Sequence, residues 1–390
     1  MLWQVPLAPS ASGLSPLAVG GVAVFAQDDV LYGLSLADGH QVWSWAYPED
    51  IEGVAGMWQW QSLVIVLTRA QGGWPHLTGL DASTGQVQWT QGVDGYVAGF
   101  YSTADGGLAI LRLDGALEVV DWSSGRVRWI RPSGYPPDAV PSPPPPMAVG
   151  DGAVLFDVNG QLTCYDDQTG RIRWTDALMP LQLANDAGVA PGLQTSAGLV
   201  YATGVQQGAG GQWPQVLLGI SAANGRVKWR LVASPRETLS AYAPGLMSVT
   251  SSSGGAWQDD FDPATGRLRW QAASAYQATA TPAGTVTAPG NDSTDQISVH
   301  NALTGQTRWT ATLAGLNLRW QQSPALAVLP DGPLVIVPAA SPDGRGLLTA
   351  FRMSDGHRAW QVTIPDPVTA LPSAVPGGIL VDSTVQLTEP

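Results

Sequence analysis

The 390-residue chain carries a formal net charge of −13, and only 13% of its residues are charged. Its 46 glycines, 31 prolines and 17 tryptophans, with a hydrophobic content of 44%, indicate a folded, turn-rich β protein rather than a disordered acidic tail. The acidic balance argues against binding to nucleic acid, which needs a Lys/Arg surface, or to an anionic membrane, and fits a cationic partner better.

Cys164 is the only cysteine, so no intramolecular disulfide and no cysteine-based metal site can form. Its place in an apolar strand pattern predicts a buried structural thiol. No run of about 18 apolar residues is present, and the first residues lack the charged and apolar regions of a signal peptide. We expect an extracytoplasmic or secreted protein whose signal or anchor lies outside this sequence, with a cytoplasmic protein as the alternative.

One pattern recurs eight times along the chain: an apolar pair, a polar position, a turn ending in Gly, and a Trp four residues later. In order, the copies read GLSLADGHQVW, GLDASTGQVQW, VVDWSSGRVRW, CYDDQTGRIRW, GISAANGRVKW, DFDPATGRLRW, VHNALTGQTRW and AFRMSDGHRAW. The tryptophans are Trp43, Trp89, Trp129, Trp174, Trp229, Trp270, Trp309 and Trp360. The spacing from the polar position to the Trp is eight residues in every copy, which indicates a structural repeat.

The turn in each copy has a clear physical basis. A short polar residue such as Thr84 precedes the Gly and can bond its own backbone, while the Gly supplies a positive φ. The turn joins two strands, and most copies place an aliphatic residue two positions before the Trp, on the face opposite the residues at one and three before it. Gln41, Thr307 and Arg358 depart from this rule, so we expect the end repeats to pack less well on that face.

Two further strand signals lie in each interval between tryptophans, for example at residues 15–19 and 22–26, which Gly20-Gly21 separates. Four strands in about 40 residues is typical of a propeller blade. We number the strands A to D from the axis outward, with the Trp on strand D.

The two ends of the chain look like parts of one blade. Residues 369–375, 378–384 and 385–389 read as strands A, B and C, and residues 2–5 read as a D strand with no A to C of its own. Pairing them closes the ring and removes exposed sheet edges. We therefore predict one all-β domain over residues 1–390, in which 2–5 complete the blade formed by 366–390. Nine blades is the preferred count, and eight is the alternative.

These repeats resemble the pyrroloquinoline-quinone (PQQ) type of propeller repeat, whose consensus runs apolar-apolar-Ala-Leu-Asp-x-x-Thr-Gly-x-x-x-Trp. The family includes quinoprotein alcohol dehydrogenases and the propeller lipoprotein of the outer-membrane β-barrel assembly machine, and the similarity covers nearly the whole chain. The resemblance implies that each repeat Trp, and Trp3 as well, packs between neighbouring blades near the turn of the adjacent repeat. Fold alone does not assign a function.

Signs of catalysis or of a bound cofactor are lacking. If the resemblance extended to the quinone enzymes of this family, it would imply a bound calcium ion, a catalytic aspartate and often a disulfide. The disulfide is excluded here, because the chain has a single cysteine. The four histidines are scattered, at His40, His76, His300 and His357. Asp259, Asp260 and Asp262, and residues 291–295, contain oxygen ligands of the kind calcium prefers, but solvated turns explain them better. We expect no enzyme activity and no cofactor.

The basic residues are placed regularly. Nine of the 18 stand one or three residues before a repeat Trp: Arg126, Arg128, Arg171, Arg173, Arg226, Lys228, Arg267, Arg269 and Arg308. This predicts a basic band on the outermost strands. One interpretation is a side patch for an acidic partner. The other, which we favour, is charge that protects exposed strand edges from pairing.

Long loops suggest where a partner binds. Residues 69–76, 204–214 and 339–346 stand at B–C connections, and residues 131–146 and 176–188 at D–A connections, on one face. The candidate binding residues are Trp74, His76, Tyr135, Trp213 and Arg345, since exposed Trp, Tyr and Arg anchor many interfaces. An equally good interpretation is that the two loop tryptophans, Trp74 and Trp213, pack over the propeller's own surface instead of binding a partner.

Three functions compete at this stage. The first is a non-catalytic scaffold that binds a protein, as an extracytoplasmic sensor, assembly or surface domain. The second is a quinoprotein-like enzyme or small-ligand binder that uses the central channel. The third is a carbohydrate-binding or structural cell-surface propeller, suggested by the surplus of aromatic residues.

Overall fold

A computed structural model shows an all-β architecture. It describes residues 16–380 except 28–29, 49–50, 71–73, 96, 104, 135–146, 159–160, 178–192, 197, 206–213, 233–236, 243–245, 252–256, 263, 274–276, 282–283, 289–295, 313–326, 329–333, 341–344, 365–372 and 376–377. The described residues contain no helix, and so none with the length and apolar character needed to cross a bilayer.

Eight four-stranded antiparallel sheets follow one another along the chain, each made of four consecutive strands. The first four comprise β1 (Leu17–Val19), β2 (Val22–Gln27), β3 (Val30–Ser35) and β4 (Gln41–Ala46); β5 (Ile51–Trp60), β6 (Leu63–Ala70), β7 (His76–Asp81) and β8 (Val87–Gly92); β9 (Val97–Thr103), β10 (Gly107–Arg112), β11 (Ala116–Asp121) and β12 (Val127–Pro132); and β13 (Met147–Gly150), β14 (Ala153–Val158), β15 (Gln161–Asp166) and β16 (Ile172–Ala177). The next four comprise β17 (Leu193–Ser196), β18 (Leu199–Val205), β19 (Gln215–Ser221) and β20 (Val227–Val232); β21 (Glu237–Tyr242), β22 (Leu246–Ser251), β23 (Trp257–Phe261) and β24 (Leu268–Ala273); β25 (Gln277–Thr281), β26 (Gly284–Ala288), β27 (Gln296–His300) and β28 (Thr307–Thr312); and β29 (Ala327–Val328), β30 (Leu334–Ala340), β31 (Gly346–Arg352) and β32 (Arg358–Ile364).

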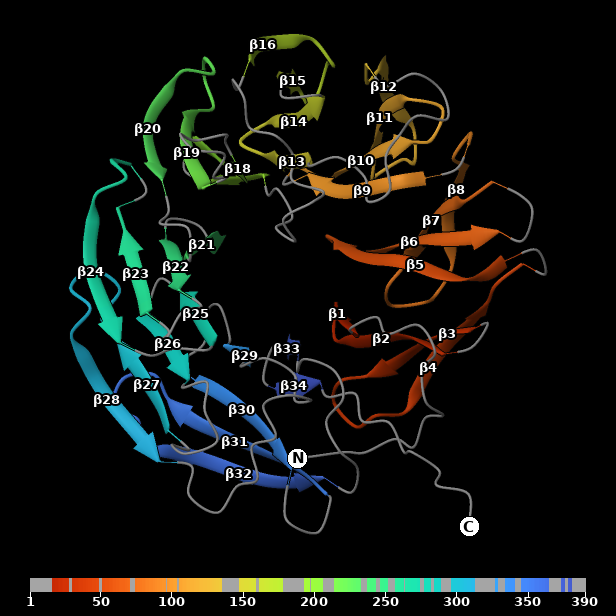
Figure 1. Ribbon diagram of the computed structural model, residues 1–390. Helices are drawn as coiled ribbons and strands as arrows, with labels where there is room; N and C mark the ends of the chain where they lie inside the picture. Colours follow the sequence, from red (N-terminus) through yellow and green to blue (C-terminus); the bar gives the residue numbers. More distant parts are fainter. Residues whose placement is uncertain are drawn as a thin grey trace, which may run out of the picture.

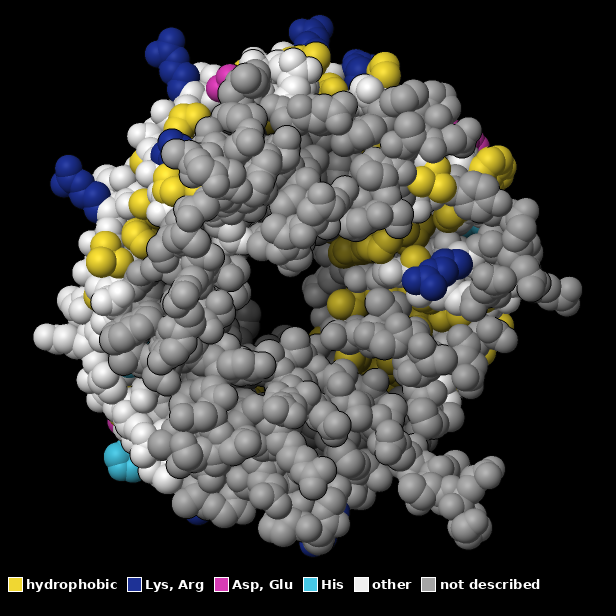
Figure 2. All heavy atoms as spheres, in the orientation of Figure 1, with side chains coloured by type: hydrophobic (Ala, Val, Ile, Leu, Met, Phe, Trp, Pro, Cys, Tyr) yellow, Lys and Arg dark blue, Asp and Glu magenta, His cyan; other side chains and the backbone are white. Residues whose placement is uncertain are grey.

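The sheets are arranged as the blades of a propeller. Figure 1 shows the first strand of the sheets nearest the axis and the fourth on the rim, with consecutive sheets side by side. Figure 2 shows an opening at the centre of the molecule. The A to D order from the axis outward, with the repeat Trp on strand D, is therefore confirmed.

The C-terminal sheet differs from the expected ninth blade. Only β33 (Ser373–Val375) and β34 (Gly378–Leu380) pair there, in a two-stranded antiparallel sheet. Residues 2–5 and 385–389, which were expected to supply its outer strands, lie outside the described residues. Nine complete blades are therefore not observed, because two of the four strands needed for the ninth are not among the described segments. The closure of the ring and the final number of blades stay predictions.

The turn between the third and fourth strands has the same construction in each sheet. In the second sheet Asp81 Oδ1 accepts hydrogen bonds from the backbone amides of Ser83 and Thr84, both at 3.0 Å. The amide of Gly85 then donates to the carbonyl of Asp81 at 2.8 Å, and Gly85 has a φ of +69°. A left-handed backbone is costly for residues with a Cβ, so the Gly fixes the turn that the sequence predicts.

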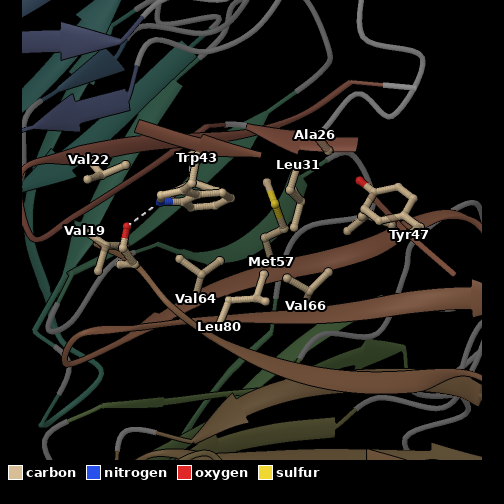
Figure 3. Close-up of a cluster of buried hydrophobic side chains, with 13 residues drawn as sticks. Val19, Val22, Ala26, Leu31, Trp43, Tyr47, Met57, Val64, Val66 and Leu80 are labelled. Atoms are coloured by element: carbon tan, nitrogen blue, oxygen red, sulfur yellow. Dashed lines mark hydrogen bonds between the residues drawn. The ribbon is translucent and has the colours of Figure 1, made fainter. Parts of the chain in front are cut away.

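The hydrophobic core lies between neighbouring sheets. Figure 3 shows one such layer, where side chains of the first sheet, including Val22 and Leu31, face Val64 and Val66 of the second. Similar clusters join the third sheet to the fourth and the fourth to the fifth. Each sheet therefore buries its faces only when it has neighbours, as in other repeat folds.

A β-bulge interrupts each outer strand one residue before its tryptophan. In the fourth sheet Cys164 pairs with Trp174 and Tyr165 pairs with Ile172, which leaves Arg173 as the extra residue. The same shift occurs in the other seven four-stranded sheets. A bulge breaks the alternation of side chains. The prediction that the aliphatic residue two before the Trp contributes to packing was wrong, because Ile172 and its equivalents are exposed.

Candidate functional site: the blade junctions and the outer rim

The repeat tryptophans connect each blade to the next one. The indole Nε1 of Trp43 donates a hydrogen bond of 2.8 Å to the carbonyl of Ala82, in the turn of the following sheet (Figure 3). Among the described residues, four other junctions have the equivalent bond, from Trp129 to Asp167, Trp174 to Ala222, Trp270 to Ala302 and Trp309 to Met353. This is the packing that the resemblance implies. Trp3 lies outside the described residues.

The turn glycine of the next repeat lies directly against each indole ring. A Cβ added to Gly170 would stand 2.6 Å from Cδ2 of Trp129, and one added to Gly85 would stand the same distance from Cδ2 of Trp43. Such separations are well below van der Waals contact. Glycine is therefore required at this position for two reasons, the close approach of the ring and the positive φ.

The basic residues one before the Trp form ion pairs within their own blades. Arg128, Arg173 and Arg269 contact Asp121, Asp166 and Asp262 at 2.8 to 2.9 Å. Hydrogen bonds from Arg173 and Thr169 lower the pKa of Asp166 to about 2. The bulge turns these side chains toward the polar position of the repeat, so their main contacts are structural.

A carboxyl pair lies at the junction of the third and fourth sheets. Asp105 forms an ion pair of 2.9 Å with Arg128 and hydrogen-bonds the side chain of the buried Asp167. Burial, and then repulsion by the Asp105 carboxylate, raise the pKa of Asp167 to about 6. Nothing in the sequence pattern indicated this pair, because it depends on how two blades pack.

Other reactive groups have structural surroundings. Cys164 is fully buried, as predicted, and burial raises the pKa of its thiol to about 11. His300 is buried against Trp270, with ring centroids 5.9 Å apart, and its Nε2 lies 3.0 Å from Thr287 Oγ1. Burial lowers the pKa of His300, so its ring is held neutral.

The loop residues proposed as partner contacts are only partly described. Trp74 lies between β6 and β7, is 52% exposed, and stands two residues from the half-buried His76. Arg345 is exposed just before β31, and Figure 1 places β1–β4 between its sheet and the sheet of Trp74. Tyr135 and Trp213 lie outside the described residues. The described part therefore does not unite these five residues in one site.

The calcium hypothesis gains no support from the side chains in view. Among the described residues no group of three or more His, Cys, Asp or Glu side chains is placed to hold a metal ion. Asp262 accepts hydrogen bonds from the turn and pairs with Arg269. Residues 291–295 lie outside the described residues.

Comparison with solved structures gives matches of low sequence identity. The crystal structure of BamB from Moraxella catarrhalis matches at 16% identity and a TM-score of 0.48, over 98% of this chain and 97% of that one. The computationally designed Ika8 protein matches at 15% identity and a TM-score of 0.51, over 85% and 93%. The quinohemoprotein alcohol dehydrogenase ADHIIG from Pseudomonas putida HK5 matches at 13% identity and a TM-score of 0.45, over 96% and 70%.

Comparison at the level of sequence assigns the family. No curated protein matches the chain. The family model described as "Outer membrane protein assembly factor BamB" matches residues 1–142, 139–288 and 253–384, which together cover almost the whole chain. With its PQQ-like repeats and four-stranded blades, the chain belongs to the family of the outer membrane protein assembly factor BamB.

Proposed function

We propose that this protein is a non-catalytic propeller scaffold that binds a protein partner outside the cytoplasm. The match to an assembly-factor family along nearly the whole chain carries the proposal. An outer-membrane assembly factor works beyond the inner membrane and by contact with other proteins, which fits both parts of the proposal.

The chemistry of the blade junctions supports a scaffold over an enzyme. Asp121, Asp166 and Asp262 accept turn hydrogen bonds and pair with arginines of their own blades. Their carboxylates are thus engaged in the turns and outer strands of their own blades. Perturbed groups of this kind often belong to structural ion-pair networks.

The loop that carries Trp74 is the proposed contact for the partner. A half-exposed tryptophan on a rigid sheet buries a large apolar area at little entropic cost when a partner covers it. Trp213, Tyr135 and Arg345, on other loops assigned to this face, are proposed to extend the contact.

Site-specific photo-crosslinking tests the proposal. A photo-reactive phenylalanine analogue is placed at Trp74, and at Leu303 as a control, because Leu303 is also exposed but lies in a turn far along the chain. In cells, position 74 should give a discrete adduct with one protein and position 303 should not. Equal adducts at both positions, or none at position 74, would refute the loop as the contact.

Two further measurements address the other parts of the proposal. Titration of PQQ with calcium into the purified protein should give no heat, and saturable heat at one site would favour an enzyme. Protease added to intact spheroplasts should degrade the protein if it is extracytoplasmic, and protection until lysis would place it inside.

A further inference from the structure

Four consecutive repeats share an outer-strand motif that the other four lack. Gly-Arg-aliphatic-basic-Trp occurs at residues 125–129, 170–174, 225–229 and 266–270. We call the following set the arginine arc: Arg126, Arg171, Arg226 and Arg267, with Val127, Ile172, Val227 and Leu268. In the other repeats the arginine position holds His40, Gln86, Gln306 or His357.

The arginines of the arc are exposed and have no side-chain partner. Within the described part of the chain, the guanidinium groups of Arg126, Arg171, Arg226 and Arg267 form no ion pair and no hydrogen bond, although their backbone amides donate to side chains of the turn. The basic residues two positions later behave differently, since Arg128, Arg173 and Arg269 pair with carboxylates. Figure 2 shows Lys and Arg side chains standing out from this part of the rim.

The aliphatic residues of the arc are exposed beside these arginines. Their exposed fractions are 37% for Val127, 60% for Ile172, 47% for Val227 and 53% for Leu268. Charge alone suffices to keep a strand edge from pairing, so edge protection does not explain why each arginine has an exposed aliphatic neighbour. The combination of an exposed arginine and an exposed aliphatic residue therefore repeats on four consecutive blades.

The blade junctions hold the arc rigid. Each arc arginine follows a glycine that lies against the tryptophan of the preceding blade, and the glycines are Gly125, Gly170, Gly225 and Gly266. The arginines are therefore spaced by the packing of the blades, and a ligand that spans several of them loses little protein entropy on binding.

The charge of the arc is opposite to that of the molecule. The chain as a whole has a net charge of −13, while the carboxylates at the polar position of three arc repeats, Asp121, Asp166 and Asp262, pair with arginines of their own blades. In the fifth sheet the polar position is Ser221, so Lys228 adds a further positive charge. A local positive surface on an acidic protein selects acidic ligands but repels long polyanions.

We propose that the arginine arc is a docking surface for an extended acidic segment of a partner protein, in which carboxylates alternate with apolar side chains. Arginines offer two parallel hydrogen bonds to a carboxylate, and the adjacent aliphatic residues cover apolar groups. This alternation favours a polypeptide over a nucleic acid or a lipid surface. The surface lies on the rim, apart from the Trp74 loop, and rests on the proposed function only in requiring a protein partner.

A synthetic peptide provides the test. A fluorescein-labelled peptide that alternates glutamate with leucine, long enough to reach across two blades, is titrated with the purified full chain and followed by fluorescence anisotropy. Replacing Arg171 and Arg226 by Gln should weaken binding about tenfold. The control pair, Arg352→Gln with Arg358→Gln, makes the same change in charge on the eighth four-stranded sheet, which lacks the motif. It should change binding of the peptide less than about twofold.

The apolar half of the arc has its own matched pair. Ile172→Ser with Val227→Ser should weaken binding of the peptide several-fold, while Val42→Ser with Val87→Ser should leave it unchanged, because these valines are equally exposed outside the arc. A peptide that alternates glutamate with serine should bind the native chain more weakly. Melting curves by circular dichroism check that each variant is folded. A further double variant, Arg171→Lys with Arg226→Lys, conserves the positive charge and should keep most of the binding of the peptide.

Several results would overturn the proposal. The glutamate–leucine peptide could fail to bind, or the arc and control pairs could lose affinity for it equally. Loss of affinity only in the serine variants, with none in the arginine variants, would also contradict the proposal. Tighter binding of oligothymidylate or of phosphatidylglycerol vesicles at the same ionic strength would assign the arc to another ligand. None of these outcomes bears on the crosslinking at Trp74, so failure here leaves the proposed function separately testable.

Discussion

The outer strands β12, β16, β20 and β24 differ from β4, β8, β28 and β32 in what they show to solvent, although in both groups a repeat tryptophan packs against the turn glycine of the next blade. Trp43 in the second group and Trp174 in the first both donate an indole hydrogen bond of 2.8 Å to the turn of the next blade. At the exposed position three residues before the Trp, the first group has an arginine whose guanidinium has no partner among the described residues, and the second group has a histidine or a glutamine.

This comparison separates two roles within one repeat. The polar position, the Gly and the Trp fix the blade junction, and every copy keeps the last two of them. The residues two and three before the Trp lie beside the bulge, where they are exposed to solvent and vary between the two groups. Changes at the junction should therefore act alike in both groups, while changes at the bulge should act differently.

The largest effect is expected at the turn glycine. Gly170→Ala and Gly85→Ala should each cost about 3 kcal/mol or more, because the added Cβ meets an indole ring and the residue keeps a positive φ. The control Gly198→Ala has a similar φ of +75° but open space around it, and should cost about 1 kcal/mol. Urea unfolding followed by tryptophan fluorescence measures all three, and unequal losses at the two junction glycines would contradict a common junction.

The indole hydrogen bond gives the next effect. Trp43→Phe should lower stability by about 2 kcal/mol, since it leaves the carbonyl of Ala82 without its partner and removes buried surface. Trp89 is the matched control, because its buried Nε1 has no acceptor in the described structure. Trp89→Phe should cost about 1 kcal/mol less than Trp43→Phe. Equal costs in thermal unfolding would show that the hydrogen bond contributes little.

A third comparison lies within one strand. Arg128→Met should cost about 2 kcal/mol, because it leaves Asp105 and Asp121 without their shared cation, whereas Arg126→Met should change stability by less than about 0.5 kcal/mol. Urea titrations of both variants at neutral pH make the measurement. A large loss for Arg126→Met would reveal a structural contact and weaken the case for the arginine arc.

The sequence predicted the parts of the repeat that depend on local chemistry. The turn at Asp81 to Gly85 follows from residue types within five positions, and the burial of Cys164 from strand alternation. The bulge was missed because alternation was assumed to run through it. The ion pairs between Asp and Arg could have been predicted from their spacing. Asp121, Asp166 and Asp262 each stand seven residues before an arginine, whereas Asp81, which has no such ion pair among the described residues, stands seven residues before Gln88.

The ninth blade and the loop site were harder to predict for another reason. Both depend on segments far apart in the chain, and the sequence of a short segment such as 2–5 carries no information about which sheet it would join. The same holds for Asp105 and Asp167, which are 62 positions apart. Only the packing of two blades brings their carboxyl groups together.

The smallest effect concerns this pair and depends on pH. The pKa of Asp167 is about 6 in the folded protein, above the ordinary value of 3.8 for an aspartate, so the folded state binds the extra proton between these values. Stability should therefore fall as pH rises through that window, and the loss should be complete above about pH 7. Asp167→Asn keeps a donor toward Asp105 but does not titrate, so it should match the native chain near pH 4 and exceed it by about 1 kcal/mol at pH 8. Urea unfolding at the two pH values measures the difference. If the advantage of Asp167→Asn were the same at both pH values, the carboxyl pair would not share a proton across the junction of the third and fourth sheets.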